Sequence, residues 1–396
     1  MRRLVILSLI PFLLLSCGSK SDKIERIWED GVEVIVNHLN PYNIEGEASI
    51  LHLEQEFTID FEKKEFAELG MTDVLGFDVD SDGGVYVLTS RSSEDFIFKF
   101  DVKGKFLFSF GRKGQGPGEL ELPRYFVVNE IDQIIVTDFG RKKLNIFKKN
   151  GDLIKEIPIG SNFRMATLLS NRNILALKGH SNREEGKIEF PIILCNEKLE
   201  EIRTLHPGRY MQNFSLAKKV NGLRLFIDYN TWKISQGLIY VGNYGSGYEF
   251  LIYDEEGNLI RKITKEYRKI KVPDKAKEKI FNYLKNNLAH FEQVKTKLYF
   301  PEFYPPFQFF FLDERRRLYV MTHEKGKKEN DFRYDIFNPE GLFIGRMELG
   351  NYGKLASSPI INSLPLNVVG KNNHIYCLRE KDNGYKELVV YKMIWE

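Results

Sequence analysis

The 396-residue sequence predicts an all-β fold, a six-bladed β-propeller closed by strands from its N- and C-termini, with one helical insertion near residues 274–298. The first observation is a short apolar strand that recurs six times after a turn; the shortest interval, 40 residues, approaches the length of a four-stranded blade. The second is a hairpin-type turn with Asp or Asn near a glycine, which follows most copies. The third is an incomplete set of strands at each end. The six copies begin at Val85, Ile134, Ile174, Ile239, Leu318 and Ile375.

Residues 1–16 have the layout of a signal peptide. Two arginines precede an apolar run over 4–15 that is too short to span a bilayer as a permanent helix. The stretch LLSC at 14–17 resembles a bacterial lipoprotein lipobox, so we expect cleavage before Cys17 and acylation of that cysteine. An ordinary secretory signal with an incidental cysteine is the alternative. Gly18, by resemblance to lipoprotein sorting in two-membrane bacteria, favours a lipid-anchored location in the cell envelope, at the outer membrane.

Residues 17–45 are expected to form a tether and leader segment, and residues 46–396 the propeller. Without the two arginines of the signal, the formal net charge falls from +3 to +1. A nearly neutral chain exerts little net electrostatic attraction on nucleic acid, so nucleic acid is not expected as a partner. The export signal opposes nucleic-acid binding as well.

The two cysteines outside the lipobox, Cys195 and Cys377, lie in apolar strand-like runs. Free cysteine is among the most buried residue types, so two buried thiols are predicted. A disulfide, which an oxidising compartment permits, is the alternative.

The two ends of the predicted propeller complement one another. Residues 49–61 alternate apolar and polar side chains before the first full repeat begins, and the last repeat stops at Glu396 without a fourth strand. The first strand belongs to no repeat, and the last repeat lacks one strand. We therefore predict that the first strand completes the last blade and closes the ring, which removes exposed sheet edges. An unclosed β-sandwich pair or a solenoid is the alternative.

The longest interval between copies contains the one clear helical pattern. Asp274 can cap, and apolar residues at 280, 281, 284, 288 and 291 recur at near-helical spacing. We interpret this segment as an insertion that packs its apolar stripe on a blade edge. A lid or partner-binding element over one face is the alternative.

The second predicted blade, residues 122–157, resembles an NHL repeat: a proline near the innermost strand, the strand IVTD, a polar corner, LNIF and an Asn-Gly turn. Together with the first blade and the leader over 28–43, it is similar to the six-bladed propeller lipoproteins of Bacteroidota. The resemblance is specific only over 28–43 and 74–157. It implies a propeller fold and an envelope location, and it carries no agreed activity or catalytic motif.

No metal or cofactor is expected. Residues 78–83 read DVDSDG, the first half of a calcium loop, but Thr89 stands where the bidentate glutamate would be needed. A hairpin turn explains the same residues and is the preferred interpretation, with calcium as the alternative. The seven histidines show no zinc-binding spacing.

Two aromatic stretches could hold a ligand. Residues 299–311 are interpreted as core around the insertion, with a stacking platform for sugars as the alternative. Residues 240–250 combine glycines with tyrosines that we expect to be exposed, which would leave room for a flat ligand.

The glycine-rich stretch 111–120 is expected to connect the outermost strand of the first blade to the innermost strand of the second. No helix and no G-K-[ST] follow, so it is not a phosphate loop. Its polar residues would stand on the face that propellers commonly use for binding, and others lie near them in the chain. The candidate contact residues are Arg112, Lys113, Gln115, Glu119, Arg124, Asp138 and Arg141.

The resulting expectation is an envelope-anchored lipoprotein that acts as a binding or scaffold module for a protein or saccharide partner. The alternative is a propeller-type, metal-dependent hydrolase or lyase with its site in the central channel. That enzyme would need Asp, Glu, Asn or His side chains from several innermost strands to converge on the axis. No catalytic residue is predicted.

Overall fold

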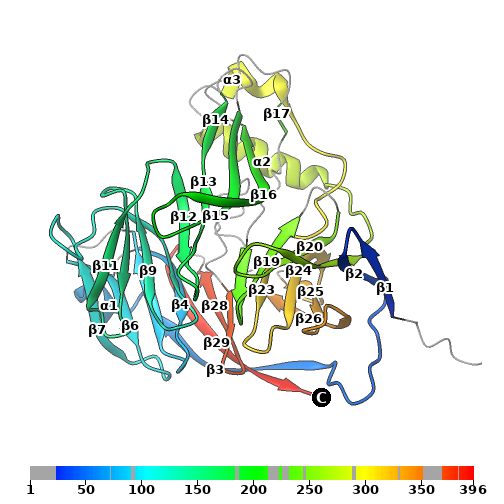
Figure 1. The fold of residues 1–396 in the computed structure, drawn as a ribbon, viewed down its shortest axis with the longest axis horizontal. Coiled ribbons are helices and arrows are strands. Elements are labelled where there is room, and N and C mark those ends of the chain that lie inside the picture. Colours follow the sequence, from blue (N-terminus) through cyan, green and yellow to red (C-terminus); the bar gives the residue numbers. More distant parts are fainter. Residues whose placement is uncertain are drawn as a thin grey trace, which may run out of the picture.

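The computed structural model describes residues 24–71, 73–90, 94–182, 187–212, 223–224, 232–243, 247–287, 291–328, 331–350, 368–381 and 383–396. The expected signal peptide and its acylation site, Cys17, lie outside these residues. Six sheets surround one axis, in the order in which they occur along the chain (Figure 1). The predicted six-bladed β-propeller is confirmed.

Each blade runs from its innermost to its outermost strand. Blade 1 contains β4 (Val74–Val79), β5 (Val85–Thr89), β6 (Asp95–Phe100) and β7 (Phe106–Arg112), and blade 2 contains β8 (Pro123–Val128), β9 (Ile134–Asp138), β10 (Lys143–Phe147) and β11 (Leu153–Pro158). Blade 3 contains β12 (Phe163–Leu168), β13 (Ile174–Lys178), β15 (Lys187–Cys195) and β16 (Glu201–Gln212), with β14 (His180–Asn182) paired to β15. Blade 4 contains β18 (Trp232–Ser235), β19 (Leu238–Asn243), β20 (Glu249–Tyr253) and β21 (Leu259–Lys265). Blade 5 contains β23 (Phe309–Leu312), β24 (Leu318–Lys325), β25 (Asp331–Phe337) and β26 (Phe343–Gly350).

Blade 6 closes the ring with strands from both termini. It contains β27 (Val368–Lys371), β28 (His374–Glu380), β29 (Lys386–Trp395) and, as its outermost strand, β3 (Leu51–Asp60) from the N-terminal region. β3 and β29 run antiparallel, from Leu51 opposite Trp395 to Asp60 opposite Glu387. The predicted closure by the two termini is therefore confirmed.

A second N-terminal addition was not predicted. β1 (Glu25–Glu29) and β2 (Val32–Asn37) form a hairpin, and β2 pairs in parallel with β21, so the sheet of blade 4 has six strands. Part of the segment expected to be tether and leader thus extends a blade. The chain then crosses blade 5, where the N–H of Tyr42 donates to the carbonyl of Phe343, before it reaches β3.

The core lies between neighbouring blades. The second strands β5 and β9 are buried on both faces, and both read as continuous apolar runs rather than as alternating ones. Rings pack at these interfaces: Phe250 stacks on Phe307, with 4.8 Å between the ring centroids. Cys195 and Cys377 are free and buried, which confirms two buried thiols.

The insertion lies between blades 4 and 5. It contains α2 (Asp274–Asn287), α3 (Phe291–Val294) and the 3₁₀ turn η3 (Lys295–Lys297), and β22 (Leu298–Tyr299) pairs in parallel with β17 (Leu223–Arg224). Figure 1 shows these helices beside the long strands of blade 3, raised above the ring. The predicted helix is confirmed. A further short helix, α1 (Lys64–Glu68), links β3 to blade 1, and no helix among the described residues is long and apolar enough to cross a membrane.

Both aromatic stretches contribute to the core. Phe307, Phe309, Phe310 and Phe311 are buried, which confirms the core interpretation for this part of 299–311. The expectation of exposed tyrosines in 240–250 is wrong for Tyr240 and Tyr248, because both pack into the same apolar cluster between blades 4 and 5. Residues 244–246 of that stretch lie outside the described part of the chain.

Candidate functional site

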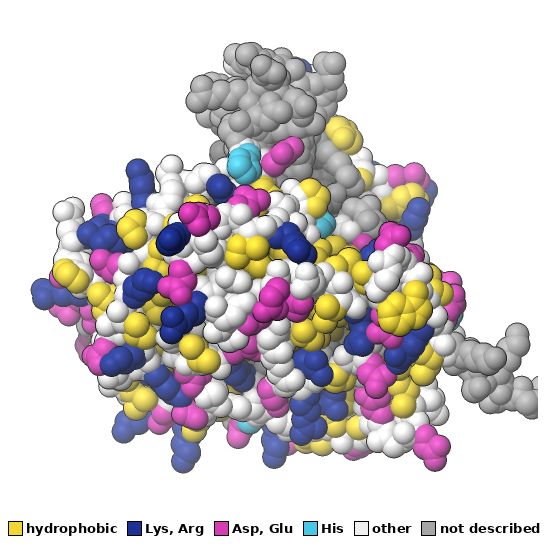
Figure 2. All heavy atoms as spheres, in the orientation of Figure 1, with side chains coloured by type: hydrophobic (Ala, Val, Ile, Leu, Met, Phe, Trp, Pro, Cys, Tyr) yellow, Lys and Arg dark blue, Asp and Glu magenta, His cyan; other side chains and the backbone are white. Residues whose placement is uncertain are grey.

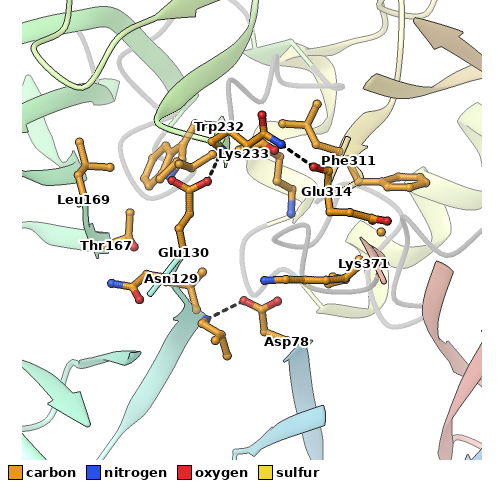
Figure 3. Close-up of a pocket in the computed structure, with 18 of the residues that line it drawn as sticks. Asp78, Asn129, Glu130, Thr167, Leu169, Trp232, Lys233, Phe311, Glu314 and Lys371 are labelled. Carbon is orange, nitrogen blue, oxygen red and sulfur yellow. Dashed lines mark hydrogen bonds between the residues drawn. The ribbon is translucent and has the colours of Figure 1, made fainter. Parts of the chain in front are cut away.

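The innermost strands of the six blades surround a cavity of about 310 Å³ on the propeller axis. Its lining includes Ser81, Glu130 and Glu314, which belong to the turns that follow β4, β8 and β23. The cavity therefore lies at the end of the axis where the innermost strands turn back into the second strands; we call this the turn end. Side chains from several blades converge on it (Figure 3).

The cavity wall is largely apolar. The large buried side chains that line it include one from the innermost strand of each of five blades: Phe77, Tyr125, Met165, Trp232 and Phe311. A concave site with aromatic walls and few polar groups is the usual form of a small-molecule site, and such sites begin at about 300 Å³.

Three of the charged residues that line the cavity come from innermost strands: Asp78 of β4, Lys233 of β18 and Lys371 of β27. The others lie in turns and are Glu130, Glu255, Asp313 and Glu314. Asp78 accepts hydrogen bonds from the N–H of Val79 and of Val128, each at 2.8 Å. Burial raises the pKa of Asp78, although the Lys371 ammonium and these N–H groups act to lower it. Burial lowers the pKa of Lys233, with Asp78 acting in the opposite direction. On the innermost strands, the Asp78 carboxylate is thus accompanied by two ammonium groups in a buried setting.

Two polar groups on this wall have no partner among the described residues. Lys371 forms no hydrogen bond or ion pair there, and its ammonium points toward the cavity interior in Figure 3. The hydroxyl of Thr167 on β12 is buried, lines the cavity and lacks a hydrogen-bond partner. An unpaired buried hydroxyl costs about 1–3 kcal/mol, so both groups could gain from a ligand acceptor atom.

The turn end is braced by hydrogen bonds between blades. The carboxylate of Glu130 in blade 2 accepts from the backbone N–H groups of Gln236 and Gly237 in blade 4. The side-chain amide of Gln236 donates to the carbonyl of Glu314 in blade 5 at 2.8 Å, and the Glu314 carboxylate accepts from the N–H of Asn373 in blade 6. These bonds hold the turns of four blades in fixed positions around the cavity.

The DVDSDG stretch forms a hairpin turn between β4 and β5, as preferred from the sequence. Asp80 accepts hydrogen bonds from the N–H groups of Asp82 and Gly84, at 3.0 and 2.8 Å. Burial acts to raise the pKa of Asp80, but the ammonium of Lys99, with that of Lys149, holds the pKa below its usual value. Cationic side chains thus neutralise the carboxylate that a calcium ion would need.

We searched the described residues for side chains that could bind a metal ion together. No three His, Cys, Asp or Glu side chains there lie close enough together to hold a metal ion. The carboxylates of Glu130 and Glu314 line the cavity as well as Asp78, and both accept hydrogen bonds from backbone N–H groups.

The predicted contact residues lie at the other end of the propeller. Asp138 pairs with Pro123 at the start of β8, whereas Val128 at the end of β8 lines the cavity. Six strand residues at about 3.3 Å each separate the two ends by roughly 17–20 Å. The contact residues predicted from the sequence therefore do not belong to the cavity.

Three of these seven residues hold the connector in shape. The buried carboxylate of Asp138 accepts from the N–H groups of Glu121 and Leu122, at 2.8 Å each. Glu119 accepts from the N–H of Gly116, and Arg141 donates to the carbonyl of Gly114. The other four predicted contact residues are exposed, and a contact surface on this face stays a prediction; they are Arg112, Lys113, Gln115 and Arg124.

The cavity residues were missed because they belong to the least conspicuous strands. Asp78 was considered only as a calcium ligand, and Lys233 and Lys371 were not singled out. The sequence does contain a signal for them. The strand that precedes each of the six recurring apolar strands is the innermost strand of its blade, so a charged residue in that strand faces the axis or a buried interface.

Sheets that repeat around one axis and close through the termini define the chain as a six-bladed β-propeller protein. Residues 78–230, which run from blade 1 through blade 3, match a family model described as a 6-bladed beta-propeller. This agrees with the resemblance noted for the first two blades.

Solved structures are similar to this chain, and one of them reaches a TM-score of 0.50. A Bacteroides vulgatus protein described as a member of the duf4221 family is 11% identical, with a TM-score of 0.50, over 88% of this chain and 100% of that one. A Bacteroides fragilis protein described as exported is 13% identical, with a TM-score of 0.49, over 91% of this chain and 99% of that one. A virginiamycin B lyase from Staphylococcus aureus is 10% identical, with a TM-score of 0.38, over 86% and 99% of the two chains. At these identities the similarity concerns the fold alone. No curated protein matches the chain.

Proposed function

We propose that this protein is an exported, lipid-anchored binding module of the cell envelope that holds a small molecule in the central cavity. The observation that carries the proposal is the cavity itself: about 310 Å³, with a wall that is mostly apolar and includes aromatic rings. The export signal over 1–16, together with the fold shared with a Bacteroides protein described as exported, supports the location.

The chemistry of the wall favours an apolar ligand with a hydrogen-bond acceptor. Trp232, Tyr125 and Phe311 offer ring surfaces, and Lys371 and Thr167 offer donors without partners among the described residues. Asp78 and Glu314 already accept hydrogen bonds from backbone N–H groups, so a free saccharide would find few unpaired acceptors on this wall for its many hydroxyl groups. The rim carboxylate of Glu130 is already engaged by backbone N–H groups of blade 4.

The proposed binding in the cavity is tested with a variant whose larger side chain occupies the cavity. The mature protein and a Met165→Trp variant would be dialysed against the small-molecule fraction of an envelope extract, and the retained species measured by mass spectrometry. We expect a species that the wild type retains and the filled variant loses, because the larger ring occupies the ligand volume. Lys148→Met, an exposed change away from the cavity, is the matched control and should retain the species.

Thermal unfolding of Met165→Trp establishes that the variant is folded. Equal retention by the wild type and a folded Met165→Trp would overturn the cavity as the site. Retention by neither protein would leave the cavity without support as a binding site.

The lipid anchor is tested at Cys17. A Cys17→Ser variant lacks the thiol to be acylated, so we expect it in the soluble fraction after cell fractionation, while the wild type stays with membranes. Membrane association that is unchanged in this variant would contradict the anchor and leave the cavity proposal untouched.

A further inference from the structure

The outer edge of blade 4 ends in a strand with an open side. β1 is the last strand of this six-stranded sheet, and its only strand partner among the described residues is β2. All five of its residues are exposed. Figure 1 shows it at the rim of the molecule, away from the axis. Open edges invite pairing or contact with another surface, and proteins commonly protect them.

This edge exposes apolar side chains. Trp28 is 71% exposed, the most exposed large hydrophobic residue in the described part of the chain, and Ile24 and Ile27 are 44% and 41% exposed. Side chains alternate along a strand, so Ile24 and Trp28 lie on one face. Trp395, by comparison, packs its ring against the Arg317 guanidinium at 3.8 Å.

Most charges around this edge are paired within the protein. Arg26 forms ion pairs with Glu33 at 2.9 Å and with Glu340 at 2.7 Å, and Lys262 pairs with Glu29 at 2.9 Å. Glu25 lies 3.4 Å from His38, and Asp30 in the turn after β1 is exposed, so the described edge carries a small acidic charge and no cluster of like charges that would select a strongly charged partner. Its accessible groups are an indole and aliphatic side chains, which suit the boundary between lipid headgroups and acyl chains.

The position of this edge in the chain identifies the surface that it meets. Cys17 precedes Ile24 by seven residues, which span at most about 25 Å when fully extended. An acyl chain on Cys17 would therefore keep Ile24 within that distance of the bilayer, and Trp28, eleven residues from Cys17, within about 40 Å. No other part of the described chain is held so close to the anchor by covalent connection.

We propose that β1 and Ile24 form the membrane-facing edge of the propeller, with the ring of Trp28 at the lipid headgroup level. This inference rests on the proposed lipid anchor. The acyl chains hold the protein on the membrane, and the edge orients it: the rim of blade 4 faces the bilayer, and the turn end of the cavity does not. The partner is a lipid surface rather than a second protein strand.

The test uses tryptophan emission from the full acylated protein on phosphatidylcholine vesicles, with and without brominated acyl chains. Bromine quenches only indoles that reach the bilayer. We expect quenching of the emission that Trp28 contributes, which is the difference between the wild type and Trp28→Phe, and no quenching in Trp28→Phe. Trp395→Phe is the matched control and should keep the quenching of the wild type.

Vesicle flotation separates the two proposals. Wild-type protein that floats but is not quenched retains the anchor and overturns the membrane-facing edge. Protein that does not float overturns both. Quenching that persists in Trp28→Phe also overturns the inference, as does a dimer of the Cys17→Ser protein in sedimentation that Trp28→Glu abolishes, because β1 would then pair with a second copy.

Discussion

The N-terminal region adds strands to two blades, and the two additions differ in kind. β3 completes blade 6 as its fourth strand, runs antiparallel to β29 and is ten residues long. β2 lies outside a blade that already has four strands, runs parallel to β21 and is six residues long. One strand closes the ring; the other extends a sheet that is already complete. Two neighbouring strands of similar apolar character therefore have different roles. The strand that pairs with an incomplete blade closes the ring, and the strand that pairs with a complete blade only widens its sheet.

The largest expected effect is the loss of closure. A chain that begins at residue 62 lacks β3, which uncovers the edge of β29 and the buried residues Leu388 and Val390. We expect a loss of more than about 5 kcal/mol, comparable with the whole stability of many domains. The measurement is chemical unfolding with gel filtration, which should show no cooperative transition and no monomer. A chain that begins at residue 39 is the control, and cooperative unfolding of both would contradict a closing role for β3.

Removal of the hairpin alone should weaken the fold without opening it. The chain that begins at residue 39 loses the buried side chains of Val34 and Ile35, and Ile35 belongs to an apolar cluster of blades 5 and 6. At about 1.5–3 kcal/mol for each buried side chain, we expect a loss of about 3–6 kcal/mol relative to a chain that begins at residue 24. Urea unfolding should stay cooperative at a lower midpoint. Loss of the cooperative transition would show that the hairpin, like β3, is required for the propeller to fold cooperatively.

A smaller effect is expected at the polar group that ties the hairpin to blade 5. The buried amide of Asn37 accepts from the N–H of Phe343 at 2.7 Å and donates to the carbonyls of Gly341 and Thr264 at 3.0 Å. Asn37→Leu leaves these groups without a partner, so we expect destabilisation of about 1–3 kcal/mol by urea unfolding.

The matched change on β3 is Gln55→Leu, because the Gln55 side chain is exposed. It should shift the free energy of unfolding by no more than about 0.5 kcal/mol. If both changes shift the free energy of unfolding equally, the buried hydrogen bonds of Asn37 do not stabilise the fold.

The smallest expected effect comes from loss of the ion pair between Asp60, at the end of β3, and Lys381. Burial acts to raise the pKa of Asp60, but the hydrogen bond from the Lys381 ammonium lowers it below its usual value, with both oxygens at 3.0 Å from Nζ. A lowered pKa stabilises the fold above the pKa of the unfolded chain, and this contribution disappears as the pH falls through the folded pKa.

Asp60→Asn should therefore cost less than about 1 kcal/mol at pH 7, because the pair is partly exposed and screened. The difference from the wild type in urea unfolding should shrink toward pH 3. A difference that grows as the pH falls would contradict the ion pair as its source.

Much of the architecture could be predicted from local pattern. The recurring apolar strands, the turns between them and the unmatched strands at the two ends predicted the blades and their closure. These signals are local in sequence, or they follow from counting strands. The hairpin over 25–37 could not be predicted in the same way, because parallel pairing of β2 with β21 joins residues more than 200 positions apart and leaves no periodic signal.

The cavity shows the same limit. The glycine-rich connector attracted attention because its composition is unusual, yet Asp138, Glu119 and Arg141 mainly hold its shape. Asp78 and Lys371 occur in ordinary strands, almost 300 residues apart, and become neighbours only when blade 6 packs beside blade 1.

By itself the sequence determined the blade number, the closure, the helical insertion and the buried thiols, because each depends on hydrophobic period, turn chemistry and strand count along one stretch of chain. Only the tertiary structure decided which side chains face the axis and which edge the N-terminal hairpin joins. Both depend on how the twisted sheets pack around the ring, and that packing brings together residues whose separation in the sequence carries no information about their distance in space.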